Sequence, residues 1–308
     1  MNNKNKLRWL GILSGIIVAA IVLTACGNEN GAAGGSDTYP NAQLLVDVAW
    51  LEEHADEVKI VDVRSRAYED GHLPGAISLT TNLIHDPDAD IGNKLIDAER
   101  FTEVIQAAGI NQDDTVVIYD GGNALQASRL FYALEYYGKN DVKILDGGYA
   151  GWLTAGKDIE FEPADFERGD FTAAAHEDRM VDKDFILANL DSEEIIFIDS
   201  RSEGEYTGED LRNNAKGGHI PGAHHIEWNI AVAQGENGVE RFKSYNELKK
   251  IYSVAEENSD KTIVPYCQTN VRGAHAYFAL RLLGHEDIRP YENSMVEWNN
   301  LEDTPVEK

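Results

Sequence analysis

The chain carries the same series of short motifs twice in the same order, and this repeat constrains the fold more than any other feature. A step of 137 residues leads from Asp62 to Asp199, and one of 147 residues from Asp120 to Cys267. The second copy therefore contains a ten-residue insertion, around Thr207 to Lys216, which we expect to form a loop near its site. The paired motifs are IVDVR (60–64) with FIDSR (197–201), GHLPGA (71–76) with GHIPGA (218–223), and VVIYD (116–120) with IVPYC (263–267).

Strand-like and helix-like segments alternate in each copy, which predicts an α/β fold of two domains, each a parallel sheet flanked by helices. Pro163 and mixed charges break the pattern at 161–170, so we place the two domains at 41–162 and 171–308. After residue 181 the second copy follows the first, with helices predicted at 182–190 and 274–283. In the first copy, strands are predicted at 59–63, 115–119 and 142–145, and helices at 48–54, 97–108 and 128–137.

Residues 1–25 are typical of a targeting segment. Basic residues precede an uncharged apolar run, Leu10 to Leu23, which is short for a membrane span. The run ends in Leu-Thr-Ala-Cys, which resembles the lipobox of bacterial lipoproteins and predicts that Cys26 carries a lipid. A plain transmembrane anchor with an incidental Cys26 is the alternative. Residues 26–40 are rich in Gly, Asn and Ala and predict a flexible tether, so we expect a protein held on the extracytoplasmic face of the cell membrane.

The charge balance excludes some partners. The 308 residues include 27 Lys and Arg against 54 Asp and Glu, a net charge of −27. Such a chain disfavours nucleic acid and the surface of an anionic membrane, so we expect membrane contact only through the N-terminal lipid. It also repels small anions unless their binding site is locally positive.

Cys267 is the residue most indicative of chemistry. The chain has two cysteines, and if Cys26 is lipidated, Cys267 has no partner for a disulfide. Cys267 follows a predicted strand and precedes a predicted helix, which places it at the carboxyl edge of a parallel sheet, where ligand sites of α/β folds collect. The backbone amides of the following loop can stabilise a thiolate there. A buried, inert cysteine is the alternative.

With LDGGYAGW (145–152) and YCQTNVRG (266–273) added, these motifs resemble the rhodanese family, specifically the two-domain thiosulfate and 3-mercaptopyruvate sulfurtransferases. The resemblance spans residues 42–302. It implies that the second domain is catalytic and that the first, with Asp120 at the cysteine position, has a structural and cleft-forming role.

The resemblance also implies double displacement, with Cys267 as the catalytic nucleophile. The Cys267 thiolate takes the sulfane sulfur of a small anionic donor, thiosulfate or 3-mercaptopyruvate, and passes it to cyanide or a thiol. No metal or organic cofactor is expected. The residues expected to bind substrate are Gln268, Thr269, Asn270, Val271, Arg272, Asp199 and Arg201.

Several of these residues also have plain structural interpretations. Arg272 can steer an anionic donor or be an ordinary first-turn helix residue. For Asp199 and Arg201 we favour the role of tying the strand end to the next loop. His219 and the pair His224-His225 lack the Cys or carboxylate spacing of a metal site, so we interpret them as turn residues. Trp152, Trp228 and Trp298 are interpreted as core or cleft-wall aromatics.

Departures from the family pattern leave the donor open. Asn270 stands where the loop usually has Gly, and asparagine tolerates a left-handed backbone. Glu205 stands where some thiosulfate enzymes place a substrate-binding Arg, Asn293-Ser294 replace a Gly-Gly, and Pro265 interrupts a strand.

Two rival functions remain. A phosphatase or arsenate-reductase loop has five residues between Cys and Arg, whereas four separate Cys267 from Arg272. A surface-tethered persulfide carrier or thiol-redox binding module would form the persulfide without significant turnover.

Overall fold

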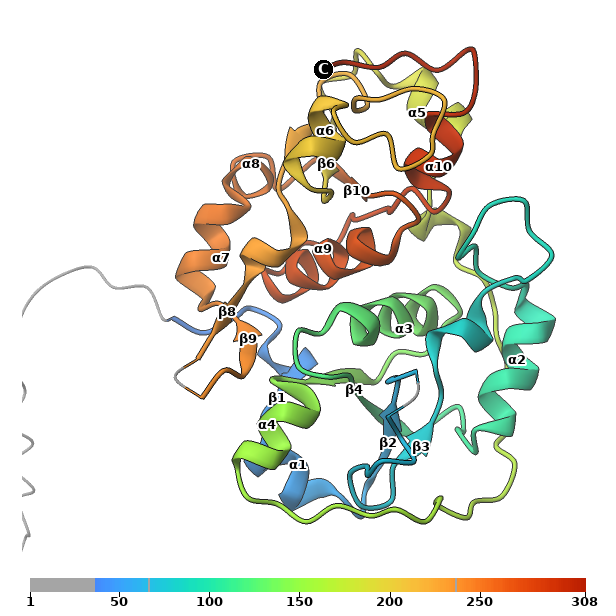
Figure 1. The fold of residues 1–308 in the computed structure, drawn as a ribbon, viewed down its shortest axis with the longest axis vertical. Coiled ribbons are helices and arrows are strands. Elements are labelled where there is room, and N and C mark those ends of the chain that lie inside the picture. The colour runs from blue at the N-terminus through green and yellow to red at the C-terminus, as the bar shows by residue number, and fades with distance from the viewer. Residues whose placement is uncertain (1–36, 66, 236) are drawn as a thin grey trace, which may run out of the picture. The chain divides into compact units, whose positions relative to one another are not determined.

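The N-terminal half contains a sheet of five parallel strands in the order β1-β5-β4-β2-β3 (Figure 1). Its central strands β2 and β4 pair from Val58 with Thr115 to Asp62 with Tyr119. Both are rich in β-branched residues and buried toward their carboxyl ends, as expected of a sheet covered on both faces. The strands are β1 (Leu45–Val46), β2 (Val58–Asp62), β3 (Ile77–Ser78), β4 (Thr115–Tyr119) and β5 (Val142–Leu145).

The C-terminal half repeats this topology. Strands β6 (Ile195–Asp199), β7 (His224–His225) and β10 (Thr262–Tyr266) are parallel in the order β10-β6-β7. Parallel bridges between Ile263 and Ile288 and between Val181 and Tyr291 continue the order of the first sheet. The predicted α/β fold of two parallel sheets flanked by helices is therefore confirmed.

Pro265 does not interrupt β10. It pairs with Ile198, and its carbonyl accepts the amide of Tyr291 at 3.1 Å. Because the N–H and C=O of one strand residue face the same side, the missing N–H of Pro265 lies on the side where pairing consists only of isolated bridges.

Helices cover the faces of both sheets, and several begin at the capping residues that the sequence offers. The Asp47, Asp97 and Asp182 carboxylates accept the backbone N–H three residues ahead, which fixes the starts of α1, α2 and α5. The helices are α1 (Val48–His54), α2 (Ala98–Ala107), α3 (Leu125–Tyr136), α4 (Gly148–Thr154), α5 (Lys183–Ala188), α6 (Glu203–Thr207), α7 (Tyr245–Ile251), α8 (Ser253–Glu256), α9 (Val271–Leu282) and α10 (Ser294–Trp298). Short 3₁₀ turns lie at η1 (Ala42–Leu44), η2 (Thr81–Ile84), η3 (Glu177–Arg179) and η4 (Trp228–Ala231), and β8 (Val232–Gln234) and β9 (Glu240–Phe242) form a hairpin.

The two halves meet along α3 and α9, which pack side by side (Figure 1). Aromatic pairs cross this interface, with Phe131 against Phe278 at 4.8 Å and Tyr132 against Tyr277 at 5.2 Å between ring centroids. Each helix faces its own sheet on one side and its counterpart on the other, so nearly all of its residues are buried. Both helices begin three residues earlier than predicted, because the residue before each is left-handed and ends the preceding loop there.

This computed structural model describes residues 37–308 apart from 66 and 236, and residues 37–308 form one compact unit. The predicted targeting segment, Cys26 and all but the last residues of the tether lie outside the described residues. Within the described part, no helix has the length and apolar character needed to cross a bilayer.

Candidate functional site

Cys267 lies directly after β10, under the first turn of α9, at the carboxyl edge of the second sheet. Its side chain is 1% exposed and forms no disulfide. Its backbone is clamped to the start of α10: the Cys267 amide donates to the Ser294 hydroxyl at 3.2 Å, and its carbonyl accepts the Met295 amide at 3.0 Å. The predicted nucleophile therefore sits on a fixed backbone below the surface.

Asn270 shapes the loop that follows. Its backbone is left-handed, with φ 55° and ψ 18°, so the expectation that asparagine can take the place of glycine here is confirmed. The Asn270 amide donates to Ser294 Oγ at 3.2 Å, and its side-chain amide donates to Glu292 Oε2 at 2.8 Å. Ser294, a departure from the family pattern, thus accepts two loop amides with one hydroxyl.

Arg272 is paired with a carboxylate. Its Nη1 and Nη2 donate to the two oxygens of Glu205 at 2.6 and 2.8 Å, a bidentate geometry. Burial opposes ionisation of Glu205, but Arg272 and Ser202 outweigh it and lower the pKa of Glu205 to about 2. Burial would also lower the pKa of Arg272; Glu205 and the Cys267 side chain outweigh it and raise that pKa. Arg272 is therefore next to Cys267, with its charge largely balanced by Glu205.

Other loop residues are held from both halves of the protein. The side chain of Gln268 exchanges two hydrogen bonds with Asn214, at 3.0 and 3.1 Å, and Asn300 also donates to Asn214 at 3.0 Å. Asn214 belongs to the ten-residue insertion, so the insertion does lie against the Cys267 loop, as expected. Thr269 Oγ1 accepts from Asn93 of the N-terminal half at 2.9 Å, whereas Val271 is half-buried at the start of α9.

Asp199 and Arg201 are buried and bonded to each other rather than turned toward a substrate. Arg201 donates to both oxygens of Asp199 and to the Gly218 carbonyl at 2.9 Å. This geometry matches the structural role we favoured over the substrate-binding role also assigned to them. The N-terminal half repeats it with Arg64, Asp62 and the Gly71 carbonyl, so the Asp-x-Arg motif ties each strand end to the following Gly-His loop.

His219 and the three tryptophans singled out from the sequence lie in packed surroundings, but His224 and His225 form strand β7 rather than a turn, and His224 is exposed. His219 stacks on Tyr206 at 3.6 Å between centroids, as His72 stacks on Tyr68 at 3.8 Å. Residues 37–308, where described, hold no group of three or more His, Cys, Asp or Glu placed to bind a metal ion. Trp152 and Trp298 are buried in the cores, and Trp228 contacts the His275 ring.

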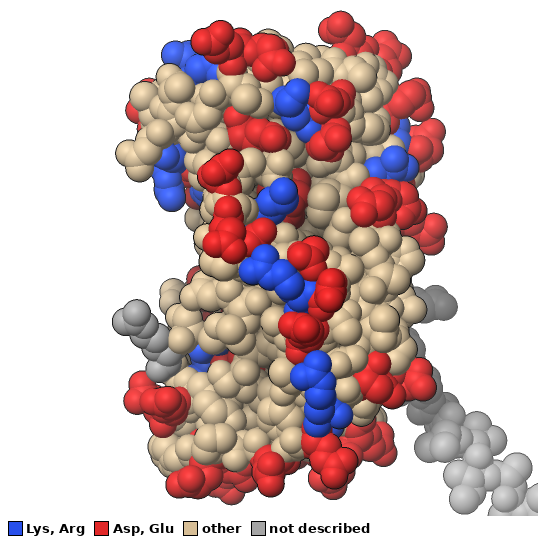
Figure 2. Space-filling model, turned by 90° about the vertical axis from the view of Figure 1, so that its right-hand side faces the viewer, with Lys and Arg blue, Asp and Glu red and all other residues tan. Residues whose placement is uncertain are grey.

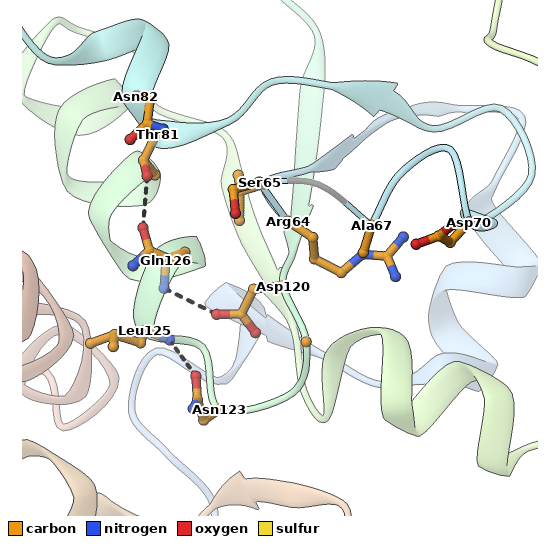
Figure 3. A pocket seen from close by; sticks show the side chains of 12 residues that line it. Arg64, Ser65, Ala67, Asp70, Thr81, Asn82, Asp120, Asn123, Leu125 and Gln126 are labelled. Carbon is orange, nitrogen blue, oxygen red and sulfur yellow. Dashed lines mark hydrogen bonds between the residues drawn. The ribbon is translucent and has the colours of Figure 1, made fainter.

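In the first copy, Asp120 takes the position that Cys267 has in the second copy. Its contacts show what kind of chemical group the loop can bind. Its carboxylate accepts hydrogen bonds from backbone amides of the loop and of the first turn of α3, and Figure 3 shows the one from Gln126. Burial raises the pKa of Asp120, and the amides act in the opposite direction. The donors are Gly122 at 2.9 Å and Ala124 at 3.1 Å to Oδ1, and Gln126 at 3.1 Å and Ala127 at 3.3 Å to Oδ2. The loop is thus a cradle for a negative group, filled here by its own side chain.

The cradle of Asp120 lies beside a pocket of about 650 Å³. Arg64 and Asp70 line this pocket, and in Figure 3 the Arg64 side chain runs away from Asp120 toward Asp70. The four amides that hold Asp120, rather than a nearby cation, therefore keep its carboxylate in place.

The loop of the second copy differs because most of its backbone amides have no hydrogen-bond acceptor among the described residues. Within 267–273, only the amides of Cys267 and Asn270 have an acceptor among the described residues, and that acceptor is Ser294. The amides of Gln268, Thr269, Val271, Arg272 and Gly273 have no acceptor there, so they are available to a negative group near the loop. This contrast was not anticipated from the sequence, which indicated only that Asp120 cannot form a persulfide.

The face of the molecule drawn in Figure 2 carries more acidic than basic side chains. In Figure 2, acidic side chains spread over both ends of the face shown, and Lys and Arg occur in small groups among them. Because the net charge of −27 repels an anionic donor, we expect any attraction to Cys267 to come from groups close to it.

Three comparisons point to one family. Residues 47–155 and 182–301 match the family model of the Rhodanese-like domain. A thiosulfate sulfurtransferase of Corynebacterium glutamicum is 30% identical, with 88% of this chain and 92% of its own length aligned. Sulfur carrier protein TtuD of Thermus thermophilus is 30% identical, with 88% of this chain and 98% of its own length aligned. SseA from Escherichia coli, whose structure is described under 3-mercaptopyruvate sulfotransferases, has a TM-score of 0.72 at 29% identity and covers 81% of this chain and 97% of SseA.

Proposed function

The chain belongs to the rhodanese-like family and is a transferase of the sulfurtransferase type, and we propose that it works through a persulfide on Cys267. The donor is thiosulfate or 3-mercaptopyruvate, and the acceptor is cyanide or a thiol. The second domain (171–308) is catalytic, and the first (41–162) is structural. The reaction needs no metal or organic cofactor.

Two displacements complete the cycle. The Cys267 thiolate attacks the sulfane sulfur of thiosulfate, the S–S bond breaks, and sulfite leaves with its electron pair. Cyanide then attacks the terminal sulfur of the persulfide, forms thiocyanate and releases the Cys267 thiolate. With 3-mercaptopyruvate the C–S bond breaks, and the carbon takes up a proton to give pyruvate.

The contrast between the two copies of the loop carries the proposal. In the first copy, four backbone amides donate to the Asp120 carboxylate, so the amides of such a loop can bind a negative group. In the second copy, Cys267 replaces Asp120. The Cys267 loop reaches its helix one residue sooner than the Asp120 loop, and its amides that have no acceptor are available to a thiolate and then to the terminal sulfur of a persulfide.

The experiment follows the sulfur atom. The fragment starting at Asp37, which omits Cys26, is incubated with donor in the absence of acceptor. It should gain the mass of one sulfur atom, on Cys267, and lose it when cyanide is added. Cys267→Ser should remove both the adduct and turnover, because a serine hydroxyl cannot replace a thiolate in sulfur transfer. Sulfur transfer by Cys267→Ser would refute the mechanism.

A carrier function is the second candidate, because TtuD, a relative over nearly its whole length, is named a sulfur carrier protein. The buried Cys267 side chain, 1% exposed, also suits a stored sulfur atom that is released only to a docked acceptor. Steady-state transfer from thiosulfate to cyanide separates the two candidates. A persulfide that forms but turns over negligibly would favour the carrier.

For the location, we propose that a lipid on Cys26 anchors the protein to the extracytoplasmic face of the cell membrane. This proposal rests on the basic residues, the short apolar run and the Leu-Thr-Ala-Cys sequence before the tether.

A further inference from the structure

Arg129 is a buried arginine of the N-terminal half that reaches the Cys267 loop of the C-terminal half. It lies on α3, and none of its side chain is exposed. Its Nη1 and Nη2 donate to the two oxygens of Glu292 at 3.0 and 2.6 Å, and Nη2 also donates to the Asn93 carbonyl at 2.6 Å. A charge placed so deeply, with a bidentate partner from the other half, requires an explanation beyond packing.

Glu292 connects Arg129 to the loop. The oxygen that accepts Arg129 Nη1 also accepts the side-chain amide of Asn270 at 2.8 Å. Two residues further along the chain, Ser294 accepts the amides of both Cys267 and Asn270. The left-handed Asn270 is therefore held by its side chain through Glu292 and by its backbone through Ser294.

The charges show why Glu292 needs a partner. An unpaired carboxylate buried against the Cys267 loop would repel a thiolate or a persulfide. Burial by itself would lower the pKa of Arg129, but Glu292, Tyr132 and the Cys267 thiolate outweigh it and raise that pKa. Arg129 thus remains positive, balances Glu292 and is close enough to act electrostatically on Cys267.

We propose that Arg129 is a positioning residue for Cys267, supplied by the domain that lacks the nucleophile. It neutralises Glu292 and thereby fixes Asn270 and the loop amides around the reactive sulfur. The inference deepens the proposed function, because it takes Cys267 as the sulfur-bearing residue. It gives the first domain a role in the chemistry of the second that domain packing alone would not provide.

The same interface contains a matched control. Arg281 of α9 donates to the two oxygens of Glu135 of α3 at 3.0 and 3.2 Å, so it forms a second bidentate ion pair between the two halves of the protein. Glu135, Tyr277 and Glu286 raise the pKa of Arg281 against the effect of its burial, and Cys267 is not among the causes. Arg281→Met therefore tests loss of an interface ion pair without loss of the link to the loop.

The experiment compares Arg129→Met, Arg129→Lys and Arg281→Met in the full chain. Mass spectrometry of the Cys267 peptide gives the rate of alkylation by iodoacetamide and the rate of sulfur uptake from thiosulfate, and kcat and KM are measured with cyanide. We expect Arg129→Met to slow both rates about tenfold or more, as expected for loss of roughly one strong interaction, and to lower kcat more than it raises KM. Arg129→Lys keeps the positive charge but cannot form the bidentate hydrogen bonds of the guanidinium. It should recover part of each rate. Arg281→Met should stay within about twofold of wild type while lowering the melting temperature.

A second variant covers the case in which Arg129→Met does not fold because Glu292 is left buried and unpaired. Arg129→Met combined with Glu292→Met removes both charges, and it should still be slow because Asn270 has lost its acceptor. Alkylation at the wild-type rate in this variant, or equal slowing by Arg281→Met, would overturn the proposal. If wild-type protein takes up no sulfur, the proposed function fails, and the alkylation rates alone decide the role of Arg129.

Discussion

Glu205 holds the guanidinium that is nearest in sequence to Cys267, so Glu205→Gln is the most informative substitution for donor binding. Glutamine keeps the shape and one acceptor for Arg272 but removes the negative charge, leaving the Arg272 charge unbalanced beside the reactive sulfur. An anionic donor should then bind more tightly. We therefore expect the substitution to lower KM for thiosulfate and to change kcat less.

The size of the effect follows from Coulomb's law. At an effective dielectric constant of about 20, unit charges about 6 Å apart interact by about 3 kcal/mol, and thiosulfate carries two charges. Screening by solvent reduces this, so a tenfold fall in KM, equivalent to about 1.4 kcal/mol, is a conservative expectation. Loss of the charge-assisted bonds should cost about 1–3 kcal/mol of unfolding free energy.

The assay is steady-state sulfur transfer to cyanide at low and high ionic strength. The advantage of Glu205→Gln should shrink as salt is added, because screening weakens the attraction between Arg272 and the donor. Glu203→Gln is the matched control: Glu203 is an exposed residue of the same helix, and its loss changes the net charge equally. An unchanged or higher KM for thiosulfate in Glu205→Gln, or an equal fall in Glu203→Gln, would refute the reasoning.

Three further predictions test the scaffold and the anchor. Asp120→Ala should lower the unfolding free energy by about 1–3 kcal/mol in urea titrations, because four amides lose their acceptor, while the sulfur adduct on Cys267 still forms. Burial raises the pKa of Asp146 to about 6, against the Phe242 amide and Arg241, so its contribution to stability is present at low pH and is lost as the pH rises from about 4 to 6. The free energy of unfolding of Asp146→Asn, measured by urea titration, should accordingly rise relative to wild type across that window, by up to about 3 kcal/mol. An equal pH dependence of the two proteins would contradict the assignment. Changing Cys26 to Ala should leave an unprocessed precursor in intact-mass measurements, and a mature N-terminus elsewhere would refute the anchor.

Much of the fold could be predicted because local patterns and the repeat agree. The strands 115–119 and 142–145 and the helix at 48–54 are observed with the predicted bounds, since β-branched runs and an aspartate cap fix them locally. The starts of α3 and α9 were wrong by three residues. Left-handed residues end the loops before these helices. At the first of them, Ala124, the residue type does not indicate a left-handed backbone.

The site was less predictable where it depends on residues distant in sequence. Cys267 and its loop could be found from the motif alone, and the insertion at Asn214 from the change in repeat spacing. Arg129 and Glu292 are separated by 163 positions, and their pairing depends on how α3 packs on α9. One signal was available: Arg129 and Glu135 are charged residues in a largely apolar helical stretch, and buried charges are rare unless they are paired.

The ion pairs explain how an acidic protein can place a reactive anion below its surface. The two arginines that act electrostatically on Cys267, Arg272 and Arg129, are balanced by Glu205 and Glu292, so the side chains contribute little net charge. In the proposed mechanism, stabilisation of the sulfur anion then rests mainly on the loop amides, which act as oriented dipoles. The first copy uses the same dipoles to hold Asp120. Removing a carboxylate from an ion pair should therefore change donor affinity, whereas removing a residue that holds the loop should change the reactivity of Cys267.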